Sequence, residues 1–283
     1  MISANPVHLR QPATQEGAAF RDEFLERGYI VVRGFFTANE MLELCAELSS
    51  ARSRDKGENC LTADNMVFRS NLYFHSPRLQ SFAAQPRLVE LLTPIIGPDF
   101  WLRWDQAVHK RPGGTEFPWH QDNAYNRLLV PHYQLWVAAT PIRRENGGLW
   151  VDPGSHLRGF LPHRYVGPYA AYQGAPRSPV LLEAEAGDVI LFSSLLLHYT
   201  SRNVSDRSRW AYVLEYVPLD DFDPYISPPY FIVARDGRPQ PRFVRTFRGK
   251  LRLRNQLRYM LPRLGAQCAR IGSAARRLLE RSG

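Results

Sequence analysis

The sequence predicts a mainly-β fold, a closed or sandwich-like barrel, preceded by a few helices. Apolar residues in the first hundred positions recur at helical spacing. From about residue 100 onward, short apolar runs alternate with Pro- and Gly-containing turns, a pattern typical of β-barrels. The 283 residues are 44% apolar, enough for a sizeable core. Because barrels of this length often form one unit, we expect a single domain over 1–245.

The first elements are a helix and a short strand. We expect a helix over 14–28, where Phe20 and Phe24 recur at helical spacing and Gly28 supplies the stop. The β-branched run over 29–32 then predicts a strand.

A second helix is expected to begin after Thr37, because Glu40 three residues later completes a capping box. This helix runs to about Ala51. The polar stretch over 52–77 predicts a long surface loop or lid. A third helix is expected over 86–96, which ends before Gly-Pro.

The second part of the chain predicts about eight strands. Asn146-Gly147-Gly148 and Asp152-Pro153-Gly154-Ser155 have the residues of tight turns between them. The expected strands are 100–110, 118–124, 132–140, 148–152, 179–183, 188–193, 196–200 and 208–217.

The positive charge is concentrated at the C-terminal end. The net charge is +9, and the segment over 246–283 holds ten Lys or Arg against one acidic residue, Glu280. The body is therefore neutral, and no nucleic-acid partner is predicted. Apolar residues of this segment lie on one helical stripe, so it is predicted to contact a membrane surface or an acidic partner, or else to pack on the barrel. The stripe consists of Leu253, Leu257, Met260, Leu261 and Leu264.

Three cysteines without metal-like spacing favour a reducing, cytoplasmic setting. The first fifteen residues lack the basic start and apolar run of a signal peptide. No stretch approaches the length of a membrane span.

Two histidines and one aspartate form a candidate metal site. His120 and Asp122 are two residues apart, so on a strand their side chains leave the same face. His198 lies in a second expected strand. Two histidines and one carboxylate form the facial ligand set of non-haem Fe(II) oxygenases, which leaves three positions for a bidentate co-substrate and O2.

Arg209 is a candidate partner for such a co-substrate. It follows His198 by eleven residues and lies on the next expected strand. Its guanidinium can pair bidentately with the distal carboxylate of a keto-diacid that chelates the iron. Arg207 competes for this role, and Arg209 is favoured by the family resemblance given next, because a spacing of eleven residues from His198 fits that family better than nine.

The ordered set of motifs resembles the phytanoyl-CoA dioxygenase family of Fe(II)- and 2-oxoglutarate-dependent oxygenases. The resemblance covers about residues 18–220, and the N-terminal stretch Glu26–Val32 with Phe35-Phe36 belongs to it. The matching pieces are Trp119-His120-Gln121-Asp122, Asn146-Gly147, Pro153-Gly154-Ser155-His156, Gly187-Asp188-Val189, and His198 through Asn203, Ser205 and Arg209.

The resemblance implies a double-stranded β-helix, a jelly roll of cupin-like form, and an enzyme that hydroxylates a small metabolite or carrier-linked acyl substrate. It implies Fe(II) held by His120, Asp122 and His198, with 2-oxoglutarate and O2 as co-substrates. Binding of 2-oxoglutarate is then expected at Arg209, Thr200 and Gln106, and with less support at Lys110 and Trp136. Related halogenases have a small residue at the aspartate position, so Asp122 argues against halogenation.

Other polar residues are assigned lesser roles. His156 is expected to brace its turn, and His109, His132 and His163 are expected to be surface or packing residues. Substrate contact is considered for Asn123, Tyr125, Asn126 and Arg127, and for Asn71, Tyr73, Phe74 and His75 in the expected lid.

Two rival functions remain open from the sequence. One is a cupin-type metal isomerase or an oxygenase independent of 2-oxoglutarate, in which Arg209 has no carboxylate to bind. The other is a non-catalytic jelly-roll binding protein.

Overall fold

The protein is represented by a computed structural model that describes residues 14–51, 60–63, 65–126, 131–221 and 226–246. The expected basic segment over 246–283 lies, apart from Thr246, outside the described residues. Its amphipathic character therefore stays a prediction.

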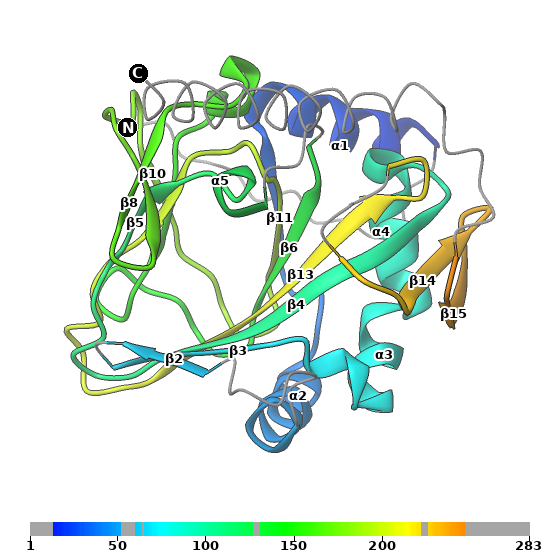
Figure 1. The fold of residues 1–283 in the computed structure, drawn as a ribbon, viewed down its shortest axis with the longest axis horizontal. Coiled ribbons are helices and arrows are strands. Elements are labelled where there is room, and N and C mark those ends of the chain that lie inside the picture. Colours follow the sequence, from blue (N-terminus) through cyan, green and yellow to red (C-terminus); the bar gives the residue numbers. More distant parts are fainter. Residues whose placement is uncertain (1–13, 52–59, 64, 127–130, 222–225, 247–283) are drawn as a thin grey trace, which may run out of the picture.

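The four longest helices, over 14–27, 38–50, 77–83 and 86–96, pack against the outer face of a large sheet (Figure 1). Their apolar residues share one core with residues of strands β4 (Phe100–Lys110), β6 (Tyr133–Ala138), β11 (Val189–Ser193) and β13 (Arg209–Pro218). The capping box of Thr37 and Glu40 is confirmed at the start of the second helix. Among the described residues, no helix combines the length and apolar character needed to cross a membrane. The helices are α1 (Thr14–Arg27), α2 (Ala38–Ser50), α3 (Pro77–Ala83), α4 (Pro86–Ile96) and α5 (Asn123–Asn126), with 3-10 turns η1 (Leu72–Phe74) and η2 (Ser155–Arg158).

Two antiparallel sheets and a hairpin make up the β part. The large sheet has the order β1-β11-β6-β13-β4-β14-β15, and the β2–β3 hairpin joins it through β4. The small sheet has the order β10-β7-β12-β5, and β8 pairs with β9. The strands are β1 (Tyr29–Val32), β2 (Cys60–Ala63), β3 (Met66–Ser70), β4 (Phe100–Lys110), β5 (Phe117–His120), β6 (Tyr133–Ala138), β7 (Leu149–Val151), β8 (His163–Val166), β9 (Tyr169–Tyr172), β10 (Val180–Leu182), β11 (Val189–Ser193), β12 (His198–Thr200), β13 (Arg209–Pro218), β14 (Tyr230–Arg235) and β15 (Arg238–Val244).

The predicted jelly roll is confirmed. A second apolar core lies between the two sheets, where Trp136 and Ile190 of the large sheet share a cluster with Leu149 and Val151 of the small one. Inward-facing side chains at the remaining positions line a cavity. The fold therefore places a ring of alternate strand residues around one central site.

The expected loop over 52–77 is wrong for its described part. Residues 60–63 and 66–70 form β2 and β3, and η1 follows. Met66 is fully buried opposite Lys110 of β4. This pairing joins residues more than forty positions apart, and local sequence carries no sign of it.

The expected strand over 118–124 is also wrong beyond its first half. Strand β5 ends at His120, and a turn leads directly into α5. His120 and Asp122 therefore do not share a strand. The hairpins β8–β9 and β14–β15 and helix α3 were not predicted.

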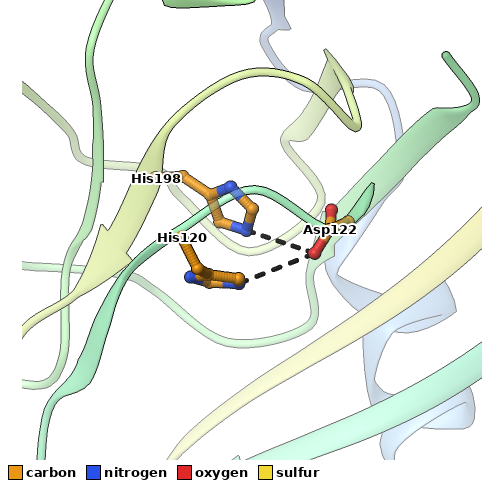
Figure 2. A group of neighbouring side chains, drawn as sticks. All are labelled: His120, Asp122 and His198. Carbon is orange, nitrogen blue, oxygen red and sulfur yellow. Dashed lines mark ion pairs between the residues drawn. The ribbon is translucent and has the colours of Figure 1, made fainter. Parts of the chain in front are cut away.

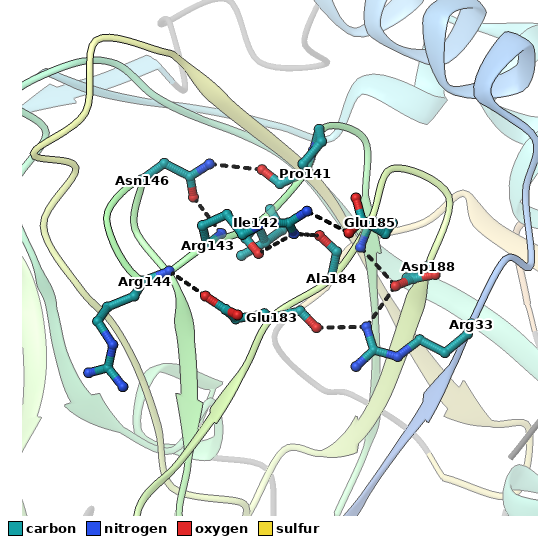
Figure 3. Close-up of polar contacts among 10 residues, drawn as sticks. All are labelled: Arg33, Pro141, Ile142, Arg143, Arg144, Asn146, Glu183, Ala184, Glu185 and Asp188. Carbon is teal, nitrogen blue, oxygen red and sulfur yellow. Dashed lines mark hydrogen bonds and ion pairs between the residues drawn. The ribbon is translucent and has the colours of Figure 1, made fainter. Parts of the chain in front are cut away.

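Asp188 and Asn146, which belong to two of the motifs found in the sequence, stabilise neighbouring loops through hydrogen bonds (Figure 3). The Asp188 carboxylate accepts hydrogen bonds from Arg33 Nη1 at 2.7 Å and from the Gly34 amide at 2.7 Å, which ties β11 to the end of β1. The Asn146 side chain accepts from the Arg143 amide and donates to Pro141 O. This closed turn fixes the position of the next residue, Gly147.

Candidate active site

Three potential metal ligands meet inside the barrel. Strands β5 and β12 are neighbours, and His120 lies directly opposite His198. The turn after β5 brings Asp122 beside them, so that its Oδ1 lies 3.6 Å from Nε2 of each histidine (Figure 2). The three ligand atoms all lie within 4.8 Å of one another.

Both imidazole rings are oriented by the backbone. Nδ1 of His120 lies 2.8 Å from the carbonyl oxygen of Pro118, and Nδ1 of His198 lies 3.0 Å from that of Leu196. Because a carbonyl can only accept, each Nδ1 carries the proton and each Nε2 turns a lone pair toward Asp122. Burial lowers the pKa of His198 to about 4, so this ring is neutral at physiological pH.

The donor set fits a divalent iron ion. Burial by itself raises the pKa of Asp122, but His198 and His120 beside it lower the pKa below its ordinary value, so the carboxylate is ionised. Adjacent ligands of an octahedral ion with bonds of about 2.1 Å are roughly 3 Å apart, close to the separations of 3.6 Å observed here. Nitrogen and oxygen donors on one face suit non-haem iron and leave the opposite face open.

Arg209 is a buried cation with unused donors. Its Nη2 donates to the Gly147 carbonyl at 3.0 Å, and its guanidinium lies 5.5 Å from the Trp136 ring centroid. Within the part of the chain that the structure describes, Nε and Nη1 have no acceptor. Burial lowers its pKa to about 10, and the group remains charged at neutral pH. A carboxylate that entered the cavity would find two free donors here.

Lys110 and Thr200 adjoin this arginine. Lys110 of β4 is the cross-strand neighbour of Arg209, and its Nζ donates to Thr200 Oγ1 at 3.0 Å and to Ser201 O at 2.7 Å. Burial, and secondarily the charge of Arg209, lowers the pKa of Lys110 to about 6. A Cβ on Gly147 would lie 2.5 Å from Lys110 Cδ, so only glycine fits at this turn.

One cavity of about 920 Å³ is lined by the three potential metal ligands, Arg209 and Thr200, whereas Lys110 is not part of its lining. Its size is typical of a site for a small molecule. Gln106 also lines it, and its Nε2 donates to Ser70 Oγ at 2.9 Å. The structure thus brings together the residues named from the sequence as His120, Asp122, His198, Thr200, Arg209, Gln106 and Trp136.

Several other candidates lie elsewhere. His156 Nε2 bonds to the carbonyl of Leu25, a bracing contact, and His109 stacks on Trp210 at a centroid distance of 4.1 Å. Arg207 is exposed, whereas Arg209 is buried. His163 accepts a hydrogen bond from the backbone amide of the residue between His120 and Asp122.

Some of the residues considered for substrate contact line the cavity, and others do not. Asn71, Phe74 and Tyr125 line the cavity. Tyr73 is buried outside the lining, and His75 is exposed. Asn123 is buried outside the lining as well. The side chain of Asn126 and all of Arg127 fall outside the described residues.

Sequence reasoning missed a polar group at the other end of the cavity. Arg103 Nη1 lies 2.9 Å and His132 Nε2 lies 3.0 Å from Glu215 Oε1, and Gln134 is the cross-strand neighbour of Glu215. All four are buried. The available signal was a single polar residue at an alternate position within an apolar strand, such as Gln134 between Tyr133 and Leu135.

Comparison with known proteins gives a consistent result. A family model described as phytanoyl-CoA dioxygenase (PhyH) matches residues 24–211. The chain is 32% identical over 234 residues to phytanoyl-CoA dioxygenase domain-containing protein 1 of Mus musculus, and the match covers 74% of this chain and 75% of that protein.

Solved structures share the fold. One is the epimerase SnoN from nogalamycin biosynthesis, in complex with Fe3+, α-ketoglutarate and nogalamycin RO, with a TM-score of 0.62, 21% identity and coverage of 81% of this chain and 96% of that chain. Another is the α-ketoglutarate-dependent carbocyclase SnoK, with a TM-score of 0.60, 18% identity and coverage of 77% and 88%.

Proposed function

Because the chain belongs to the phytanoyl-CoA dioxygenase family, whose members use Fe(II) and 2-oxoglutarate, we propose that it hydroxylates a C–H bond of a small molecule. We assign His120, Asp122 and His198 as the iron ligands. Arg209, Thr200 and Gln106 are assigned to 2-oxoglutarate. The chain over 1–245 is then one catalytic domain.

The proposal rests on two groups that line one cavity and that each lack a full set of binding partners, namely the candidate metal ligands and the guanidinium of Arg209. Two imidazoles and a carboxylate face a common point, and the buried guanidinium of Arg209 has two donors without acceptors among the described residues. A cupin-type isomerase without 2-oxoglutarate would leave that buried cation unpaired, which is costly. A non-catalytic protein has no need of either group.

Each residue has a defined part in the reaction. Arg209 fixes the distal carboxylate of 2-oxoglutarate, and Thr200 lines the same end of the cavity. Lys110, outside the lining, donates a hydrogen bond to Thr200 Oγ1. Phe117 and Phe192 pack against the imidazoles of His120 and His198 at centroid distances of 4.5 and 4.9 Å, and so place apolar surface beside the two rings. When bound, Fe(II) with 2-oxoglutarate and O2 supplies the oxidant for the C–H bond, and succinate and CO2 are released.

Asp122 supports oxidation over halogenation, because its carboxylate occupies the position where a halide would have to bind. Hydroxylation is the first outcome to test. The epimerase and the carbocyclase of the same fold make isomers and ring-closed compounds the next products to look for. The described structure gives no account of a membrane or acidic partner for 246–283, and such contact stays a proposal.

The ligand assignment is tested by His120→Ala and Asp122→Ala, with His109→Ala as the control because His109 lies outside the cavity. We expect the first two variants to lose Fe(II) binding and succinate release. The control is expected to retain both. Full 2-oxoglutarate decarboxylation by either ligand variant would show that the assignment is wrong.

A further inference from the structure

The side chain of Gln134 is buried. It lies on β6 and is 1% exposed. Its Oε1 has no hydrogen-bond donor within the part of the chain that the structure describes. A buried amide oxygen without a donor costs free energy in the free protein. Such a group is therefore suited to a partner that arrives from outside.

Gln134 faces the cavity close to the metal ligands. Its cross-strand neighbours on the same face of the sheet are Phe192 and Glu215. The ring of Phe192 in turn lies 4.9 Å from the ring of His198. Because directly opposite side chains are about 5 Å apart, the Gln134 amide is within reach of a molecule placed against the metal site.

This end of the cavity is distinct from the end assigned to 2-oxoglutarate. Arg209 and Glu215 lie on the same strand, β13, six residues apart. This spacing corresponds to about 20 Å at roughly 3.3 Å per residue. The facing pair Trp136 and Val213 separates them. A carboxylate held at Arg209 therefore does not reach Gln134.

The surroundings define the chemistry of the ligand. The charge of Glu215 is already engaged by Arg103 at 2.9 Å and by His132 at 3.0 Å, so this end offers no uncompensated charge to an ionic group. The remaining walls of the cavity are mainly aromatic and apolar. They include Phe68, Phe74, Trp104, Phe117, Tyr169 and Ile226.

We propose that Gln134 is a specificity-determining residue whose Oε1 accepts a hydrogen bond from a hydroxyl group of a neutral substrate with an apolar body. The proposal rests on the proposed function, because it takes the cavity to be the substrate site. It narrows the substrate class to neutral alcohols and excludes ionic groups at this position.

Binding of matched probes tests the proposal. The protein, loaded with Fe(II) and 2-oxoglutarate without O2, is titrated calorimetrically with 1-adamantanol, 1-fluoroadamantane and adamantane-1-carboxylate. We expect the alcohol to bind roughly five- to tenfold more tightly than the fluoride, the effect of one hydrogen bond. Gln134→Leu removes this preference, and Gln173→Leu, an exposed residue outside the cavity, retains it.

A second measurement separates binding from a structural role. Because Gln134→Leu replaces an amide with an unsatisfied oxygen by an apolar group of similar size, the thermal midpoint of the free protein is expected to rise. A structural glutamine would give a fall. The proposal is overturned if the midpoint falls, if the variant keeps the preference, or if the wild type prefers the fluoride or the carboxylate. Failure of the proposed function is seen separately, as absence of succinate release by the wild type in air.

Discussion

Replacement of Arg209 by methionine should weaken 2-oxoglutarate binding without destabilising the protein. The guanidinium is buried and has one hydrogen bond, to Gly147. Its pKa of about 10, in place of 12.5, reflects the loss of solvation on burial. This difference corresponds to roughly 3 kcal/mol by which the folded protein disfavours the charge. Methionine removes that penalty and loses a charge-assisted hydrogen bond worth about 1.5–3 kcal/mol. The free protein should therefore keep its stability or gain up to about 1.5 kcal/mol.

Binding of 2-oxoglutarate should weaken strongly in the same variant. Nε and Nη1 of Arg209 are both available to the carboxylate, and each charge-assisted hydrogen bond contributes about 1.5–3 kcal/mol. Loss of both amounts to about 3–6 kcal/mol. At about 1.4 kcal/mol per factor of ten, the dissociation constant should rise by about two to four powers of ten.

Two measurements check this pair of effects. Anaerobic calorimetry gives the 2-oxoglutarate affinity in the presence of Fe(II), and urea unfolding gives the stability of the free protein. Arg207→Met is the matched control, because Arg207 is exposed two residues away. A dissociation constant within threefold of the wild type would refute the assignment of Arg209. Destabilisation of the free variant would refute the reasoning from burial.

Three further predictions concern Lys110 and Gly147 beside Arg209 and the buried carboxylate of Asp105. Because the pKa of Lys110 is about 6, the amine is largely neutral above that pH, and a 2-oxoglutarate carboxylate that binds beside it favours protonation of the amine. Binding is then coupled to proton uptake, so 2-oxoglutarate affinity, measured by calorimetry, should fall up to about tenfold per pH unit above pH 6. Asp105→Asn should destabilise the protein by about 2–4 kcal/mol in urea, because the carboxylate accepts from two backbone amides and one tyrosine hydroxyl. Gly147→Ala should lower 2-oxoglutarate affinity at least about tenfold by displacing Arg209, whose Nη2 would lie 3.3 Å from the new Cβ. Gly167→Ala, where φ is also positive (58°) but the space around the new Cβ is open, should not.

Local signals in the sequence were sufficient for the elements that local chemistry controls. The capping box at Thr37 and the strands over 100–110 and 208–217 are found where they were expected. The β2–β3 hairpin was missed because Met66 becomes a strand residue only through pairing with β4. Hydrogen bonds across such sequence distances leave no local pattern.

The site was predictable only in part, for a similar reason. His120, His198 and Arg209 stand out by residue type and spacing in the sequence. Gln134 and Glu215 are ordinary polar residues in apolar strands, and their place in the site depends on neighbours on other strands. A buried amide oxygen without a donor is recognised only when the whole barrel is closed around it.

His120 and Asp122 face the same point for a reason other than the shared strand face that the sequence predicted. Strand β5 ends at His120, and the turn before α5 places Asp122 beside it. Between them, the side chain of Gln121 is fully buried and bonds to two carbonyl oxygens and one amide of neighbouring loops. This anchor holds the backbone between the two ligands, so that both can face one ion. A two-residue spacing therefore fits the site through an anchored turn, and the side chain of the residue between the ligands holds that turn in place.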